Sequence, residues 1–248
     1  MTTVLKLGGS VITEKDRPET IDEASLDRAA DAVARALESA AVADLVIVHG
    51  GGSFGHHHAA RHGVSTTTGT HDVTALAAIH EAMKALNEAV LERLIDRDVP
   101  VIPIHPLSVA HYDEAGRLVF PTGVIEAVLG EGFVPVLHGD GVVGVGVGVR
   151  VASGDELVVK LADALDADRV GVCSTVPGVL DDDGSVIDRI DDYEAVEAVL
   201  GESEATDVTG GMAGKVRTLL DLRASASIFG LEGLESFLEG GAPGTTIG

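Results

Sequence analysis

One stretch limits the possible folds of this chain more than any other: a short apolar run that ends in three consecutive glycines. Residues 45–48 are Leu-Val-Ile-Val, a composition typical of a buried strand. The glycines at 50–52 end this strand, because glycine readily adopts a positive φ and lets backbone N–H groups approach an anion. Helix-forming residues return after Gly55. We therefore expect a strand, a glycine turn and a helix start, which together commonly bind phosphate.

The composition favours a soluble protein with a large aliphatic core. Of the 248 residues, 45% are hydrophobic and 3% aromatic, so the core must consist mainly of Val, Leu, Ile and Ala. The one cysteine, Cys173, excludes an internal disulfide and is typical of a reducing compartment. The chain has no signal-like N-terminus and no apolar run of about 18 residues. We expect a cytoplasmic protein that does not bind a membrane.

The net charge of −23 restricts the possible partners. Its long-range field repels phosphates, so we do not expect a nucleic-acid partner. The acidic residues are scattered along the chain, which indicates either a highly soluble surface or adaptation to salt; we favour the second. At about 1 M salt the Debye length is about 3 Å, so the self-repulsion is tolerable. An anionic substrate would then need cations placed locally at its site.

Apolar periodicity alternates between strands and helices along the chain, which predicts a mostly parallel sheet covered on both faces. The fold class is therefore α/β, a three-layer αβα sandwich. We expect one domain over residues 1–248, with an N-terminal lobe over about 1–138 and a C-terminal lobe over about 139–248. The elements predicted most clearly are helices over 22–40, 72–97, 154–165 and 213–224, strands over 3–7, 45–48, 134–137 and 169–173, and a Val/Gly hairpin over 142–151.

Two features near the glycines have competing interpretations. Gly50, Gly52 and Gly55 match the dinucleotide-binding pattern, but no acidic residue clearly ends a second strand about twenty residues later. Lys6 interrupts an apolar strand, so it either lies on an edge strand or reaches a site at the strand end. The sequence therefore leaves open whether the glycine turn binds a dinucleotide or another phosphate, and which of these two positions Lys6 has.

The three consecutive histidines at 56–58 do not predict a metal site. Consecutive side chains on a helix point about 100° apart, so they do not converge on one ion. His58 and His62 are correctly spaced, but the carboxylate of a zinc-protease pattern is missing. A histidine beside a phosphate turn is better explained as a hydrogen-bond donor whose protonated form the phosphate favours. We expect no protein metal ligands.

Four motifs occur at wide spacing: residues 6–10 (Lys-Leu-Gly-Gly-Ser), 49–55, 153–155 (Ser-Gly-Asp) and 210–215, which begins Gly-Gly-Met and ends in Lys. Together they resemble the amino acid kinase family, whose members phosphorylate carboxylates, carbamate or phosphates with ATP. The resemblance extends over nearly the whole chain, to the final 244–247. Within this family, Lys15 and the His56 that follows Ser-Phe-Gly resemble the residues that distinguish the subgroup acting on isopentenyl phosphate.

The resemblance implies a cytoplasmic, homodimeric enzyme of isoprenoid biosynthesis that uses ATP with Mg²⁺ and transfers phosphate directly in line. The alternatives are a related kinase acting on a phosphonate antibiotic, a carboxylate or a nucleoside monophosphate, and, ranked lower, a dinucleotide-binding oxidoreductase. The catalytic residues implied are Lys6, Lys15, His56, Asp155 and Lys215. The ATP-binding residues implied are Lys6, Gly8, Gly9, Ser10, Gly52, Thr175, Gly210, Gly211 and Lys215. The acceptor-binding residues implied are Gly51, Gly55, His56, Gly154, Met83 and Leu86.

Overall fold

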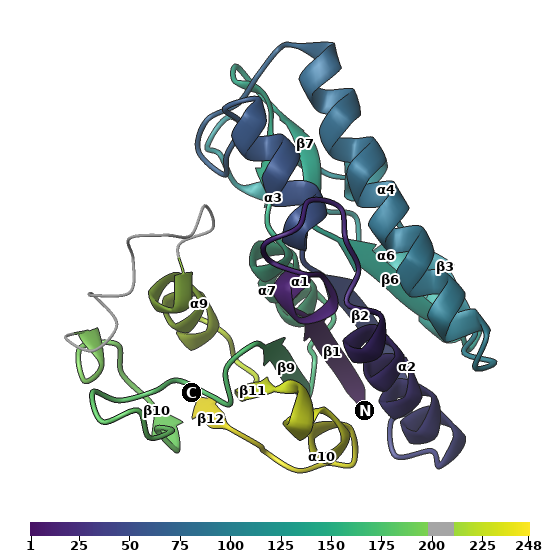
Figure 1. Ribbon diagram of the computed structural model, residues 1–248, viewed down its shortest axis with the longest axis vertical. Coiled ribbons are helices and arrows are strands. Elements are labelled where there is room, and N and C mark those ends of the chain that lie inside the picture. The colour runs from purple at the N-terminus through teal and green to yellow at the C-terminus, as the bar shows by residue number, and fades with distance from the viewer. Residues whose placement is uncertain (198–210) are drawn as a thin grey trace.

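The computed structural model describes residues 1–197 and 211–248 (Figure 1). Its main sheet has the strand order β10-β12-β11-β9-β1-β2-β6-β3. Neighbouring strands run parallel except β11 and β12, which are antiparallel. The strands are β1 (Thr2–Leu7), β2 (Asp44–His49), β3 (Val101–Pro103), β6 (Val134–His138), β9 (Arg169–Ser174), β10 (Arg189–Ile190), β11 (Ala226–Gly230) and β12 (Thr245–Ile247).

Helices cover both faces of this sheet, as predicted. One apolar cluster joins the sheet to α2 (Glu23–Glu38), α4 (Val73–Ile95) and α10 (Leu234–Leu238). A second cluster joins the opposite face to α6 (Gly123–Gly130), α7 (Gly154–Ala164) and α9 (Gly211–Leu220). The prediction of an αβα sandwich is confirmed. The division into two lobes stays a prediction, since one sheet continues across the expected boundary.

The alternation of side chains along β1 explains its lysine. Leu5 and Leu7 belong to the cluster on the α2 and α4 face, whereas Val4 belongs to the cluster on the α7 face. Because side chains two residues apart share a face, Lys6 lies on the same face as Val4. Strand β1 pairs with β2 on one side and β9 on the other. The interpretation of Lys6 as an edge-strand residue is therefore wrong.

A smaller sheet of order β5-β4-β7-β8 lies beside α4. It contains the Val/Gly hairpin, which is confirmed with its tip over residues 144–148, and two short strands. The shorter apolar run over 118–120 also predicts a strand, which the structure has at Leu118–Val119, whereas the strand at His111–Tyr112 was not predicted. Its strands are β4 (His111–Tyr112), β5 (Leu118–Val119), β7 (Asp140–Gly144) and β8 (Gly148–Ala152). The remaining elements are α1 (Gly9–Ile12), α3 (Gly52–Arg61), α5 (Pro106–Val109) and a 3-10 turn over Leu231–Gly233.

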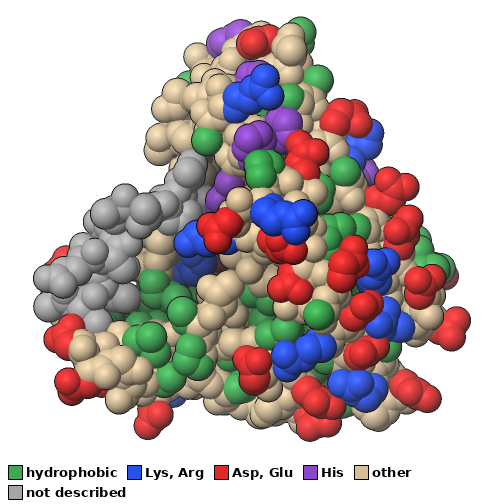
Figure 2. Space-filling model, in the orientation of Figure 1, with side chains coloured by type: hydrophobic (Ala, Val, Ile, Leu, Met, Phe, Trp, Pro, Cys, Tyr) green, Lys and Arg blue, Asp and Glu red, His purple; other side chains and the backbone are tan. Residues whose placement is uncertain are grey.

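Acidic side chains are spread over the visible face of the molecule, with Lys and Arg interspersed among them (Figure 2). Some cations join segments of the surface: Arg97, just after the end of α4, contacts Asp27 at 3.0 Å and Asp31 at 2.5 Å on α2. Within the described ranges, none of the helices is both long enough and apolar enough to cross a membrane. The surface charge is therefore dispersed and mostly solvated.

We expect the thermal unfolding midpoint to rise as KCl increases from about 0.15 M to about 2 M, because the Debye length falls from about 8 Å to below about 3 Å. Circular dichroism melts measure this. A matched variant that neutralises exposed acids should show a weaker salt dependence; it carries Glu38→Gln, Glu88→Gln, Asp98→Asn, Glu114→Gln and Asp182→Asn. Equal salt dependence in both proteins would show that surface charge is not the cause.

Candidate active site

Two glycine turns meet where β1 and β2 end. A Cβ atom on Gly9 would lie 2.1 Å from the Gly52 nitrogen, and one on Gly50 would lie 2.6 Å from the Gly9 nitrogen. Gly52 also has a φ of +48°. Since real Cβ atoms do not approach other atoms so closely, only glycine allows these two backbones to touch. The turn after β1 and the turn after β2 are thereby fixed relative to one another.

Thr13 reinforces the contact between the turns. Its hydroxyl donates to the Gly9 carbonyl at 2.8 Å and accepts from the Ser53 N–H at 3.0 Å. Ser53 in turn contacts the loop before α2, where its hydroxyl lies 3.3 Å from both the N–H and the carbonyl of Thr20. The turns and this loop therefore form one hydrogen-bonded unit.

The literal dinucleotide pattern has a packing cause here. Helix α3 begins at Gly52, so Gly55 lies inside the helix, three residues after its start. A Cβ atom on Gly55 would lie 2.6 Å from the Met83 sulfur on α4. The first two glycines of the pattern permit contact with the neighbouring turn, and the third permits contact between two helices.

Lys6, Asp155 and Lys215 form a charge cluster, although they come from β1, α7 and α9. Lys6 Nζ donates to Asp155 Oδ1 at 2.6 Å, and Lys215 Nζ lies 4.0 Å from Asp155 Oδ2. Their side chains are 7%, 15% and 16% exposed in the order Lys6, Asp155, Lys215, so the cluster is largely shielded from water. The carboxylate therefore fixes two ammonium groups at one place.

The environment of Asp155 keeps its carboxyl group ionised. Burial by itself raises the pKa of Asp155, but the charges of Lys6, Lys215 and His56 outweigh that effect. Its pKa therefore lies below its ordinary value. The same interaction places His56 within electrostatic range of the cluster, as the resemblance implied.

The first turn of helix α7 places Asp155 beside the ends of β1 and β2. The Ser153 hydroxyl accepts from the Glu156 N–H at 3.1 Å and caps the helix. A Cβ atom on Gly154 would lie 3.2 Å from Lys6 Cε and 3.4 Å from the His49 carbonyl oxygen. Glycine at this position therefore brings the start of α7 against both β1 and β2.

The other predicted residues have different placements. Ser10 and Thr175 are exposed after β1 and β9, and Gly211 is buried at the start of α9. Lys15 is exposed in the loop between α1 and α2, and its role stays a prediction. Gly210 lies outside the described residues. Gly8 donates its N–H to the Cys173 carbonyl at 2.9 Å, which joins its turn to β9.

Met83 and Leu86 do not line open space in this structure. They are 1% and 0% exposed and belong to the apolar cluster between the sheet and α4. Met83 lies directly behind the turn, since a Cβ atom on Gly51 would meet its sulfur at 3.4 Å and His56 Cδ2 at the same distance. Leu86 is a core residue, which corrects the expectation that it lines an open pocket for the acceptor.

A row of histidines behind the turn was not predicted. His49 and His138 are 0% exposed, and His105 and His80 continue the row with ring centroids 5.2 to 5.7 Å apart. Asp140 lies at its outer end, 2.8 Å from His80 Nδ1. The signal in the sequence was a His-Gly pair at the end of each of two apolar strands.

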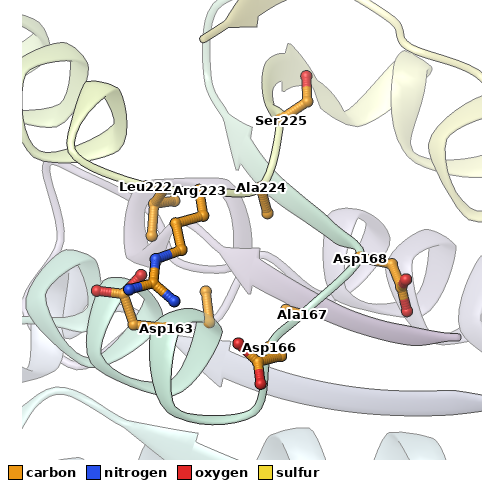
Figure 3. A pocket seen from close by; sticks show the side chains of 9 residues that line it. Asp163, Asp166, Ala167, Asp168, Leu222, Arg223, Ala224 and Ser225 are labelled. Carbon is orange, nitrogen blue, oxygen red and sulfur yellow. The ribbon is translucent and has the colours of Figure 1, made fainter.

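A cavity of about 310 Å³ lies at the opposite end of the strands from the two turns, beside the first residues of β9 and β11 (Figure 3). Asp163, Asp166 and Asp168 contribute to its lining, and Arg223 points toward Asp163. Three carboxylates make it unsuitable for a phosphate. In the described part of the chain, no three His, Cys, Asp or Glu side chains are grouped so that they could hold a metal ion.

The chain belongs to the amino acid kinase family, whose model matches residues 1–228. Two similar proteins are isopentenyl phosphate kinases. That of Haloferax volcanii is 58% identical over 98% of this chain and 97% of its own, and that of Methanocaldococcus jannaschii is 33% identical over 92% and 90%. A solved isopentenyl phosphate kinase structure, 29% identical, covers 100% of both chains with a TM-score of 0.84.

We expect Asp155→Asn to lower the free energy of unfolding by about 2 kcal/mol, because two largely buried ammonium groups lose their shared counter-ion. Denaturant titration measures this. Asp163→Asn is the matched control, since Asp163 is exposed on the same helix and should change stability by less than about 0.5 kcal/mol. Equal effects of the two substitutions would contradict a stabilising role for the cluster.

Proposed function

We propose that this protein phosphorylates isopentenyl phosphate with ATP, forming isopentenyl diphosphate and ADP. The observation that carries the proposal is the Lys6–Asp155–Lys215 cluster beside two glycine turns in backbone contact. This arrangement offers a pair of phosphate sites with cations between them. The relatives named above, which are similar over nearly the whole chain, support the same activity.

In this proposal both turns contact the ATP phosphates, and the second turn also binds the acceptor phosphate together with the start of α7. The ATP phosphates lie at Gly8, Gly9, Ser10 and Gly52, while Thr175, Gly210 and Gly211 contact the nucleotide from the C-terminal half. The acceptor phosphate lies at Gly51, Gly55, His56 and Gly154. The contact between Gly9 and Gly52 supports this assignment because it fixes the distance between the two groups.

The chemistry then needs positioning and charge neutralisation more than proton transfer. The attacking oxygen belongs to a phosphate that is already anionic, so no general base is required. It attacks the γ-phosphorus in line, a P–O bond forms to the acceptor, and the bond to the ADP oxygen breaks. Lys6 and Lys215 neutralise the β- and γ-phosphates, and Asp155 orients both amines.

Mg²⁺ accompanies ATP in this proposal, held mainly by phosphate oxygens. The engagement of Asp155 by two ammonium groups supports this assignment, because that carboxylate is not available as a metal ligand. Magnesium often retains phosphate and water ligands in such sites. The ion would screen charge between the nucleotide phosphates.

The apolar tail of the acceptor is proposed to lie toward α4, with Met83 behind the turn as its nearest residue. We further propose a homodimeric, cytoplasmic and salt-adapted enzyme. The net charge of −23 and the similarity to a Haloferax protein support salt adaptation. Lys6, Lys215 and His56 supply the local cations that an anionic acceptor requires on such a negative surface.

An ADP-release assay with a panel of acceptors tests the proposed function. We expect turnover with isopentenyl phosphate to exceed that with a phosphonate antibiotic, amino acid carboxylates and nucleoside monophosphates. His56→Ala should raise the KM for isopentenyl phosphate by about tenfold or more, with a smaller change for ATP, because a charge-assisted hydrogen bond is lost. A better acceptor elsewhere in the panel would overturn the substrate, and equal effects on both KM values would overturn the role of His56.

Lys15 is proposed to meet the transferred phosphate as charge develops on its equatorial oxygens. Lys15→Ala should then lower kcat by about 10²- to 10³-fold at saturating substrates. Arg17→Ala is a control, since Arg17 lies in the same exposed loop and pairs with Glu14 at 3.0 Å. An unchanged kcat in Lys15→Ala would remove this lysine from the transition state.

A further inference from the structure

Two buried histidines occupy equivalent positions on neighbouring strands. His49 ends β2, His138 ends β6, and the two are partners in the parallel register. Each is followed by a glycine whose carbonyl oxygen lies close to the imidazole of the preceding histidine. His49 Nδ1 is 3.1 Å from the Gly50 oxygen, and His138 Nδ1 is 3.0 Å from the Gly139 oxygen. The same local arrangement thus occurs twice, side by side.

The chemistry of these contacts fixes the proton on each ring. A carbonyl oxygen can only accept a hydrogen bond, so Nδ1 must carry the proton in both histidines. Burial lowers the pKa of His49 and of His138, which keeps both rings neutral. Each Nε2 therefore has a lone pair and accepts a hydrogen bond.

The Nε2 atoms of the two rings have different partners. His138 Nε2 lies 2.8 Å from His105 Nδ1, which can donate to it. His49 Nε2 lies 3.1 Å from Asn87 Oδ1, so His49 has an oxygen beside each of its ring nitrogens. The backbone carbonyl of Gly50 can only accept, whereas a side-chain amide exchanges its oxygen and its NH₂ group by a 180° rotation. With the proton on Nδ1, the Asn87 amide takes the rotated orientation and donates its NH₂ group to Nε2. Asn87 is 1% exposed on the apolar face of α4, where an amide is costly unless paired.

The orientation of the Gly50 carbonyl sets the direction of the next N–H group in the chain. The carbonyl of Gly50 and the N–H of Gly51 belong to one planar trans peptide unit and point in opposite directions. A hydrogen bond that holds the carbonyl against His49 therefore aims the Gly51 N–H away from the ring. Gly51 precedes α3, whose first N–H groups have no partner within the helix.

We propose that His49, held by Asn87, is a positioning residue that aims the Gly51 N–H at the acceptor phosphate. The proposal rests on the proposed function for the identity of that phosphate. The ring itself does not touch the substrate; it acts through the backbone of the turn. His138 fixes the adjacent peptide after β6 in the same manner, and the row of imidazoles holds both rings in place.

The ring protons can be tested without any activity measurement. Long-range ¹H–¹⁵N spectra of the whole protein labelled at histidine distinguish a protonated Nδ1 from a protonated Nε2. The 10 histidine signals are assigned from the signals lost in His49→Asn and His138→Asn. We expect His49 and His138 to be neutral with the proton on Nδ1. A proton on Nε2 of His49 would overturn the proposal.

A matched pair of variants tests the positioning role. His49→Asn keeps an NH₂ group near the position of Nδ1 and can still donate to Gly50, whereas His49→Gln keeps a polar group near Nε2 and loses that bond. We expect His49→Gln to raise the KM for isopentenyl phosphate about tenfold, the equivalent of one hydrogen bond, with less than about threefold change for ATP. His49→Asn should restore most of the affinity.

Each outcome of the variant experiment has a distinct meaning. Equal impairment of the two variants, or a parallel rise in the KM for ATP, would overturn the role of His49. If one variant fails to fold by circular dichroism, the wild-type spectra decide the question, with the His49 signal assigned from the variant that does fold. If wild-type protein does not use isopentenyl phosphate while the Nδ1 protons are found as expected, the proposed function fails and the assignment of the rings stands.

Discussion

The contact between two glycine backbones determines how the rest of the site is arranged. Gly9 and Gly52 approach so closely that a side chain on either would separate β1 from the start of α3. Everything that binds at one turn is therefore registered against the other. The glycines of this chain are required at this point by sterics, and their match to a dinucleotide pattern is a by-product of that requirement.

The charge cluster lies at the same end of the strands as the two turns. β1 lies between β9 and β2, so Lys6 extends from the interior of the sheet onto the α7 face and meets Asp155 there. An ammonium group in such a place is stable because a carboxylate with a lowered pKa neutralises it. The apolar sheet thus carries one charged side chain in β1, at the place where the turns converge.

Local patterns in the sequence predicted the fold class and the main helices. β-Branched runs marked the central strands, and apolar spacing marked α4. The motifs around Lys6, Asp155 and Lys215 selected three side chains that lie together in the structure, and their roles stay a prediction. In the second sheet β4 was missed, because it has two residues and forms only through tertiary pairing.

Long-range side-chain contacts account for the remaining differences. Leu86 has a spacing that suits either a pocket or a core, and only packing against the sheet decided for the core. The histidine row joins residues far apart in the chain, so local patterns show only the two His-Gly pairs and not the row that they belong to. Asn87 was a usable signal, since one amide among the buried positions of α4 requires a partner.

The hydroxyl of Thr13 has a consequence for cooperativity. It bonds at once to the turn after β1 and to the start of α3, and Ser53 extends that connection to the loop carrying Lys15. A ligand that orders one of these segments reduces the entropy that the others still have to lose. With the two phosphates bound as proposed, the affinities at the two turns are linked, and thermodynamic reciprocity makes the enhancement equal in both directions.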